Sequence, residues 1–315
     1  IKNFKSNSFN EIEKYRKEAK DFWLINPVKE YYGNSLNINV SGDYIYESKN
    51  TKNGFIITSA ENCKYVNNLS APSTKWCFDY TNWGHNSELL YECQSVSSGA
   101  YNSRFSMFCY PQPMNLEYCI YAISGCEDLF GCVGVKKKKY CILNKQYTKE
   151  EYEELRSKII TNMNTNPFID KQSRIWKYGE FFPHNILPFA YNETFAHDFF
   201  PKTKEEALNE GFTWNEKEKN KYIPTIKFSD LDDVLPINND ILNQIIECHC
   251  GNCYKIVLGE FNLLKRFNLP IPRSCPECRR IIRFKKNNLP IYYNRTCYKC
   301  SISIKTTYAP DRPEI

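Results

Sequence analysis

Two Cys-x-x-Cys pairs near the C-terminal end constrain this chain more than any other feature of its sequence. The pairs are Cys250/Cys253 and Cys275/Cys278, with 21 residues between them. Each such turn presents two thiolates from one tight loop, and two turns complete the tetrahedron of ligands that Zn²⁺ prefers. We therefore predict one structural zinc ion held by these four cysteines. Because four thiolates leave no open coordination position, this metal is not expected to activate water.

Three further cysteines lie close to these pairs. Cys248 and His249 directly precede the first pair and are alternative ligands. A third pair, Cys297/Cys300, has no partner pair after it. Half a site cannot close a tetrahedron, so this pair is a candidate second metal half-site with three alternatives. The chain is truncated, another chain completes the site, or the two thiols are free.

The positive charge of the chain is concentrated in the same segment. Residues 248–315 carry 13 Lys and Arg against 4 Asp and Glu, a net +9, whereas the rest carries 29 against 32, a net −3. Basic groups on a compact zinc scaffold predict contacts with phosphates. The candidate nucleic-acid-binding residues are Lys265, Arg266, Arg273, Arg279, Arg280, Arg283, Lys285 and Lys286.

The region from residue 37 to 147 has a different texture, in which short aromatic and β-branched runs alternate with Asn, Ser and Gly. Such runs are typical of short strands with frequent turns. Six cysteines recur here at separations of 14 to 17 residues, which predicts a β-solenoid in which they stack. The region contains no CxxC, so a ladder of buried thiols is favoured over a metal or redox array. The six are Cys63, Cys77, Cys93, Cys109, Cys126 and Cys141; Cys119 and Cys132 fall between them.

Capping boxes predict the starts of three helices, at Ser8, Thr148 and Thr203, each followed three residues later by Glu. We expect the helix after Thr148 to cover the open end of the last coil. The predicted fold class is mainly β with helices (α+β), in four regions. They are a helical lead-in (1–36), the cysteine-laddered solenoid (37–147), a capping helix with an irregular aromatic and Pro-rich region (148–247), and a basic zinc ribbon (248–315).

Several motifs carry a resemblance to known families. Cys-Gly-Asn-Cys, Leu-Pro-x-Pro-Arg and Cys-Pro-Glu-Cys-Arg-Arg in the C-terminal segment resemble the "probable zinc-ribbon" family of bacterial proteins. Over nearly its full length, through motifs such as Val40–Tyr46, Tyr140–Tyr147 and Tyr308–Ile315, the chain resembles uncharacterised cysteine-rich proteins of candidate-phylum bacteria. This resemblance implies a β-solenoid joined to a zinc ribbon, and it implies no reaction.

Three functions follow as hypotheses. The first is a non-enzymatic zinc protein that binds RNA or DNA through its basic C-terminal segment. The second is a scaffold in which the solenoid binds a protein partner or a second copy of the chain. The third is an enzyme acting on carbohydrate or nucleic acid, for which no catalytic residue is assigned. The adjacent carboxylates Glu127 and Asp128 are expected on a solvated turn, or on opposite faces of a strand.

Composition also bears on the compartment. No stretch approaches the roughly 18 consecutive apolar residues of a membrane helix, so no membrane partner is expected. Seven of the 15 cysteines follow Glu247, mostly as CxxC pairs. That usage favours metal binding in a reducing compartment, and we expect a cytoplasmic protein.

Overall fold

The computed structural model describes residues 5–26, 36–71, 73–84, 87–216, 222–236 and 238–314. The chain divides into two compact units. The solenoid unit is Glu30–Asn215, and the second unit combines Ile1–Lys29 with Glu216–Ile315. The N-terminal lead-in therefore belongs with the C-terminal segment, and the expected middle region is divided between the two units near residue 215.

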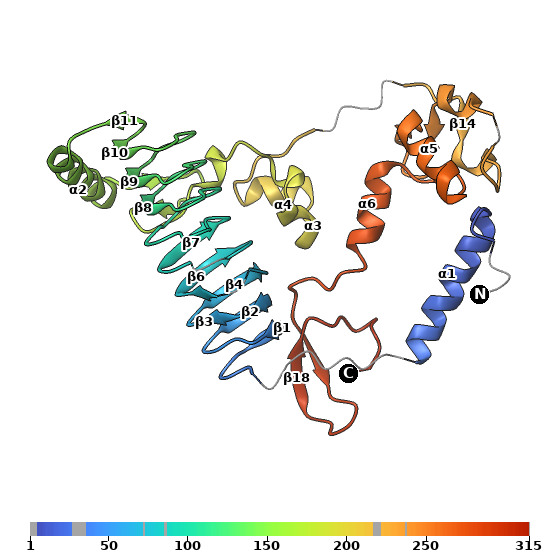
Figure 1. Cartoon of the computed structure of the whole chain (residues 1–315), viewed down its shortest axis with the longest axis horizontal. Helices are drawn as coiled ribbons and strands as arrows, with labels where there is room; N and C mark the ends of the chain where they lie inside the picture. Colours follow the sequence, from blue (N-terminus) through green and yellow to red (C-terminus); the bar gives the residue numbers. More distant parts are fainter. Residues whose placement is uncertain are drawn as a thin grey trace. The chain divides into compact units, whose positions relative to one another are not determined.

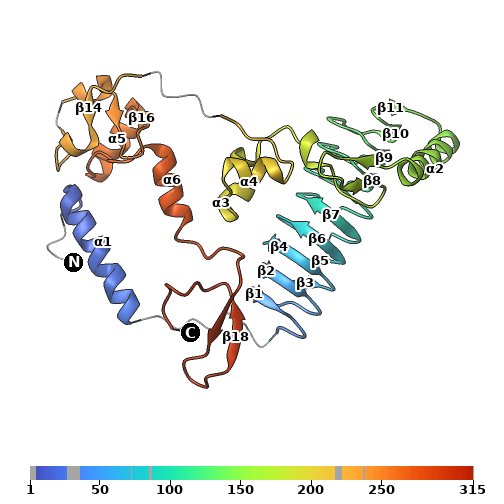
Figure 2. The ribbon, with the colours of Figure 1, turned by 180° about the vertical axis from the view of Figure 1, so that it is seen from behind.

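The solenoid unit contains a β-solenoid of about 8 turns. Its parallel strands follow one another along the stack (Figure 1), and β3 pairs with β5 on a second side (Figure 2). The stack ends where β10 pairs antiparallel with β11. The strands are β1 (Gly42–Tyr46), β2 (Lys52–Thr58), β3 (Ala60–Glu61), β4 (Lys64–Leu69), β5 (Thr74–Lys75), β6 (Cys77–Thr81), β7 (Leu90–Gln94), β8 (Met114–Glu117), β9 (Glu127–Phe130), β10 (Lys139–Ile142) and β11 (Lys145–Gln146).

Each coil is shorter than the cysteine spacing predicts. Gly42 pairs with Gly54, Lys64 with Phe78 and Met114 with Glu127, so successive rungs are 12 to 14 residues apart at these pairs. The predicted single column of six cysteines is therefore wrong. Cys63 and Cys77 share a column, but Cys93 stacks on Tyr80.

A three-residue repeat explains the short coil. Residues in the left-handed backbone region recur at every third position, for example at Asn50, Asn53, Ile56, Ser59 and Asn62. The residue after each of them points into the interior, and the one after that lies in the strand ladder. A turn at every third residue makes each side of the coil three residues long, and four sides account for 12 residues. Asn tolerates this conformation better than most residues, which suits the many Asn at these positions.

All eight solenoid cysteines are buried, as the ladder prediction required. Cys119 and Cys132 are interior residues on neighbouring rungs and do not fall between columns. Several thiols donate to a carbonyl of the next rung, as Cys93 does to Ser103 at 3.4 Å. Small side chains suit this narrow interior, because Ser, Thr and Ala occupy many of the other inward positions.

Helix α2 (Lys149–Thr165) begins at Thr148 with the complete predicted capping box. It packs against the flank of the solenoid, through an aromatic cluster that includes Phe105, Tyr118 and Phe130 from successive rungs. The helix therefore covers the side of several rungs as well as contacting β10 near the end of the stack. The rest of this unit consists of β12 (Phe168–Ile169), β13 (Ile175–Trp176), η1 (His184–Ile186), η2 (Tyr191–Glu193), α3 (Phe195–Phe199) and α4 (Lys204–Asn209).

The second unit is built around a small sheet and two helices. Ser8 caps α1 as predicted, and its hydroxyl also donates to Asp233 at 2.6 Å, while the guanidinium of Arg273 lies over the ring of Phe9. The elements are α1 (Phe9–Ile25), β14 (Ile226–Lys227), η3 (Phe228–Asp230), η4 (Asp240–Asn243), β15 (Ile246–Glu247), β16 (Cys253–Tyr254), α5 (Leu258–Phe267), α6 (Pro276–Phe284), β17 (Tyr293–Thr296) and β18 (Ser303–Thr306). Within the described parts of both units, no helix has the length and apolar character needed to cross a membrane.

Candidate metal centre

Four thiols converge in the second unit, and they are Cys248, Cys250, Cys275 and Cys278. Their sulfur atoms all lie within 4.8 Å of one another. The Cys248 and Cys278 sulfurs are 3.8 Å apart, as are those of Cys250 and Cys275. A tetrahedron with metal–sulfur bonds of about 2.3 Å has edges of about 3.8 Å, so this group fits a tetrathiolate metal site.

One of the four predicted ligands is not a member of this group. Cys253 lies outside it, and its thiol faces the carbonyl of Tyr222 at 3.5 Å. Cys253 pairs with Glu247 in the β15–β16 ladder, and residues directly opposite in a ladder share a face. Cys248 follows Glu247 and therefore points to the other face, where the remaining thiols lie. The strand register thus brings Cys248 into the cluster in place of Cys253.

The first two thiols come from the turn between β15 and β16. Cys248 N–H donates to the carbonyl of Asn252 at 2.8 Å, and Gly251 N–H donates to the carbonyl of Cys248 at 2.9 Å. Gly251 has a φ of +83°, a region that glycine enters without strain. This tight turn presents Cys248 and Cys250, two residues apart, on one side.

The other two thiols come from the start of α6. Cys275 is the N-cap, and its sulfur accepts the backbone N–H of Cys278 at 3.4 Å. Pro276 occupies the first turn, where its missing N–H costs nothing. The unpaired N–H groups and positive end of a helix stabilise thiolates. A further N–H, that of Cys275, points at the sulfur of Cys248 at 3.2 Å.

Burial and hydrogen bonds between the thiols shift the pKa values of the clustered cysteines in opposite directions. Burial by itself raises the pKa of Cys250, but hydrogen bonds from the Asn252 N–H and from the neighbouring thiols bring that pKa down to about 7. Burial and the neighbouring sulfurs raise the pKa of Cys278 well above its ordinary value. Ionisation of one thiol therefore opposes ionisation of its neighbours in this cluster.

The remaining pair, Cys297 and Cys300, lies at the tip of the β17–β18 hairpin. Ser301 N–H donates to the carbonyl of Cys297 at 2.9 Å, which closes the turn. Within the described residues these two thiols join no group of three or more metal-binding side chains. The pair is therefore a candidate half-site and no more.

The structure separates the eight predicted nucleic-acid-binding residues into three groups, according to what their side chains contact. Three are engaged with protein groups: Arg279 pairs with Glu260 at 2.6 Å, Arg280 pairs with Glu277 at 2.8 Å, and Arg273 donates to the carbonyl of Leu231 at 2.9 Å. Lys265 forms the second group by itself, because it is exposed but its ammonium donates to Asn239 at 3.1 Å. The exposed remainder is Arg266, Arg283, Lys285 and Lys286.

No family model, curated protein or solved structure matches this chain. The resemblance to the zinc-ribbon family and to the cysteine-rich bacterial proteins therefore rests on the sequence motifs alone.

Proposed function

We propose that the second unit is a zinc-held module that binds nucleic acid, RNA or DNA, through exposed cations at the far end of α6. One observation carries this proposal: α6 begins at two of the clustered thiols, Cys275 and Cys278, and ends among Arg283, Lys285 and Lys286, which are exposed. A metal bound at the first turn would hold the whole helix, and the cations with it, in one orientation.

Zinc is the metal we propose. Four thiolates with sulfur separations near 3.8 Å suit Zn²⁺, which prefers soft ligands in a tetrahedron. When bound, the ion would supply folding energy to a unit whose three-stranded sheet has strands of only two residues each. The ligands would be Cys248, Cys250, Cys275 and Cys278, and the complete thiolate set gives the site a structural role.

The exposed cations suit a backbone contact better than base recognition. Among the described residues, Arg266, Arg283, Lys285 and Lys286 form no salt bridge, so they can approach phosphates without breaking an ion pair. The aromatic residues beside them, Phe284, Tyr292 and Tyr293, are half-buried, which limits stacking on bases. We therefore expect weak sequence preference and strong dependence on salt.

The test uses the full chain and fluorescently labelled single-stranded RNA, single-stranded DNA and duplex DNA. Dissociation constants are measured from about 50 to 200 mM salt. The triple substitution Arg283→Gln, Lys285→Gln and Lys286→Gln should weaken binding. It should also reduce the slope of log K against log salt by about 0.7 to 0.9 for each phosphate that the variant no longer neutralises.

The solenoid offers a matched control. Lys136, Lys137 and Lys138 are three consecutive exposed lysines, and replacing them with Gln removes the same charge. If the two triple variants weaken binding equally, the effect is one of net charge and the α6 site is excluded. Absence of binding by metal-loaded protein at low salt would exclude the function itself.

A further inference from the structure

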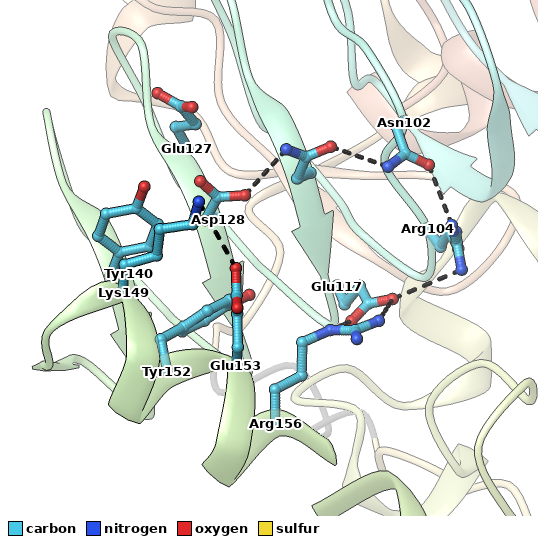
Figure 3. Close-up of a pocket in the computed structure, with 11 residues that line it drawn as sticks. Asn102, Arg104, Glu117, Glu127, Asp128, Tyr140, Lys149, Tyr152, Glu153 and Arg156 are labelled. Carbon is cyan, nitrogen blue, oxygen red and sulfur yellow. Dashed lines mark hydrogen bonds and ion pairs between the residues drawn. The ribbon is translucent and has the colours of Figure 1, made fainter.

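A separate cavity of about 510 Å³ lies in the solenoid unit, between the flank of the solenoid and one face of α2 (Figure 3). Its volume lies within the range of small-molecule pockets, about 300–1,000 Å³. Lys149, Tyr152, Glu153 and Arg156 line it from α2, and their spacing places them on one helical face. The other wall comes from successive rungs of the solenoid.

Glu117 joins the two walls. Its side chain is 6% exposed and accepts two hydrogen bonds from Arg156, one from Nε at 2.7 Å and one from Nη2 at 2.9 Å. The hydroxyl of Tyr178 donates to the same carboxylate at 2.5 Å, and Arg104 lies 3.6 Å away. A bidentate pair of this kind fixes both partners, so the cavity is preformed.

An amide ladder forms the floor on the solenoid side. Asn102 donates to Asn115 at 2.8 Å, Asn115 donates to Asp128 at 2.9 Å, and Arg104 donates to Asn102 at 3.0 Å (Figure 3). Asn102, Asn115 and Asp128 all have left-handed backbones, which turn their side chains outward in register. Each amide uses one N–H and one oxygen lone pair in the ladder. A second donor and a second lone pair remain for a ligand.

The lining corrects one expectation about Glu127 and Asp128. They lie at the start of β9 and both line the cavity, so they are neither on a solvated turn nor on opposite faces. The alternation of an ordinary strand fails here because Asp128 has a φ of +52°. Glu127 is paired with Lys139 at 2.8 Å.

The charges of the lining nearly cancel. Three cations and four anions line the cavity, a net −1, since 3 − 4 = −1. Arg104 and Arg156 face Glu117, and Lys149 lies 3.8 Å from Glu153. A phosphate polymer would meet no uncompensated positive charge here. The cavity instead presents alternating donors and acceptors beside Tyr140, which suits a neutral ligand rich in hydroxyl groups.

An exposed strip continues from the cavity along the same flank. Trp76, Leu89, Tyr101 and Met114 are 45%, 46%, 42% and 41% exposed. Glu88 pairs with Tyr101 and Cys77 with Leu90, so Trp76 and Leu89 occupy the rung positions equivalent to Asn102. Large apolar side chains exposed together on successive rungs are typical of a binding surface. Aromatic rings can stack against the apolar faces of sugar rings.

We propose that this cavity and strip bind a neutral oligosaccharide. One sugar unit occupies the cavity between the amide ladder and α2, and the rest of the chain lies across Tyr101 toward Trp76. This site is independent of the nucleic-acid proposal, because every residue in it belongs to the solenoid unit.

The test uses the full chain with four neutral probes, cellohexaose, chitohexaose, xylohexaose and mannohexaose. Binding is measured by calorimetry and by saturation-transfer NMR. At least one probe should bind with a dissociation constant below about 1 mM. Tyr101→Ala and Glu153→Ala should each weaken that binding at least about tenfold.

Two control variants match these changes. Tyr121→Ala removes an exposed tyrosine from another column of the solenoid, and Glu154→Ala removes an α2 carboxylate that does not line the cavity. Both should bind as the unchanged protein does, with all four variants checked for folding by circular dichroism. The proposal is overturned if no probe binds with a dissociation constant below about 1 mM. Equal weakening by the controls, or binding only of heparin or RNA with strong salt dependence, would overturn it as well.

Discussion

Cysteine has opposite roles in the two units of this chain. In the solenoid, eight thiols are buried along the narrow interior, at most two of them in contact, and burial raises the pKa of Cys93 and Cys109 to about 12. In the second unit, four thiols meet within 4.8 Å. The first arrangement gives no set of four ligands, whereas the second places four sulfurs where a cation could bind them. The number of cysteines is therefore a poor guide to metal binding, which depends on how the thiols are placed relative to one another.

The backbone explains this difference. The three-residue repeat of the solenoid sends each interior side chain inward from its own side of the coil. A hydrogen bond from Cys119 lowers the pKa of Cys132 to about 7, but two thiols on neighbouring rungs still supply only half a ligand set. In the second unit, a tight turn and a helix N-terminus aim thiols at one point.

The largest expected effect distinguishes the two candidate ligand sets. Cys248→Ser should abolish stoichiometric zinc binding, because it removes one of four clustered thiols, whereas Cys253→Ser should retain the metal. A structural zinc ion contributes about 10–16 kcal/mol in small domains, so loss of the metal should unfold the second unit. Metal content is measured by mass spectrometry of the purified protein, and folding by thermal denaturation. The reverse result would show that Cys253 is the ligand and that the β15–β16 register shifts on metal binding.

A core substitution tests whether the solenoid is stabilised by packing alone. Leu116 is fully buried, and Leu116→Ala should lower the free energy of unfolding of the solenoid by about 2–5 kcal/mol. Zinc content should not change. Denaturant unfolding with and without a chelator measures both points, and Leu263→Ala, at an exposed position of α5, is the control. A solenoid transition that moves with the chelator would contradict the division into two independently stabilised units.

The same Cys→Ser change should be mild inside the solenoid. Cys119 stacks on the buried Ser106, whose hydroxyl accepts the Cys119 N–H at 3.1 Å. Serine is therefore already compatible with this column, and Cys119→Ser should cost only about 1 kcal/mol. Chemical denaturation measures the cost. A loss of metal, or a cost similar to that of Leu116→Ala, would mean that the solenoid thiols act as more than interior packing.

An effect of similar size is expected in the outer asparagine ladder. Asn50 donates to Asn62 at 3.1 Å and accepts from Asn39 at 2.9 Å, on a backbone with a φ of +47°. Asn50→Ala should cost about 1 kcal/mol, because it removes exposed hydrogen bonds and strains the backbone. Asn50→Gly keeps the backbone relaxed and should cost less. Thermal denaturation compares the two, and equal costs would mean that backbone strain contributes nothing.

Some of the structure follows from local sequence. Ser8, Thr148 and Thr203 each cap a helix where the S/T-x-x-E pattern predicts one. Burial of the solenoid cysteines followed from the absence of CxxC in that region. In α5, Phe261 and Leu264 are three residues apart and both buried, the spacing of one helical face, whereas Phe267, the last residue of the helix, is 56% exposed.

The cysteine spacing gave the wrong coil length, although the asparagine spacing in the same region carries the correct one. Asn39, Asn50 and Asn62 are separated by 11 and 12 residues, and Asn102 and Asn115 by 13. These intervals match the rungs, whereas the cysteines come from four different interior columns and give a longer apparent period. The asparagine spacing is informative because these residues adopt the left-handed conformation and stack on one another.

The sequence by itself determined that the chain contains a cysteine-lined β-solenoid, three capped helices and a C-terminal set of clustered thiols. These features depend on residues close together in the chain or on side-chain type. Only the tertiary structure decided that Cys248 joins the thiol cluster and Cys253 does not, that α2 lies along the flank to enclose a cavity, and that α1 belongs with the second unit. Each of these depends on strand register or on contacts between distant segments, such as Ser8 with Asp233 and Arg156 with Glu117, which local patterns do not encode.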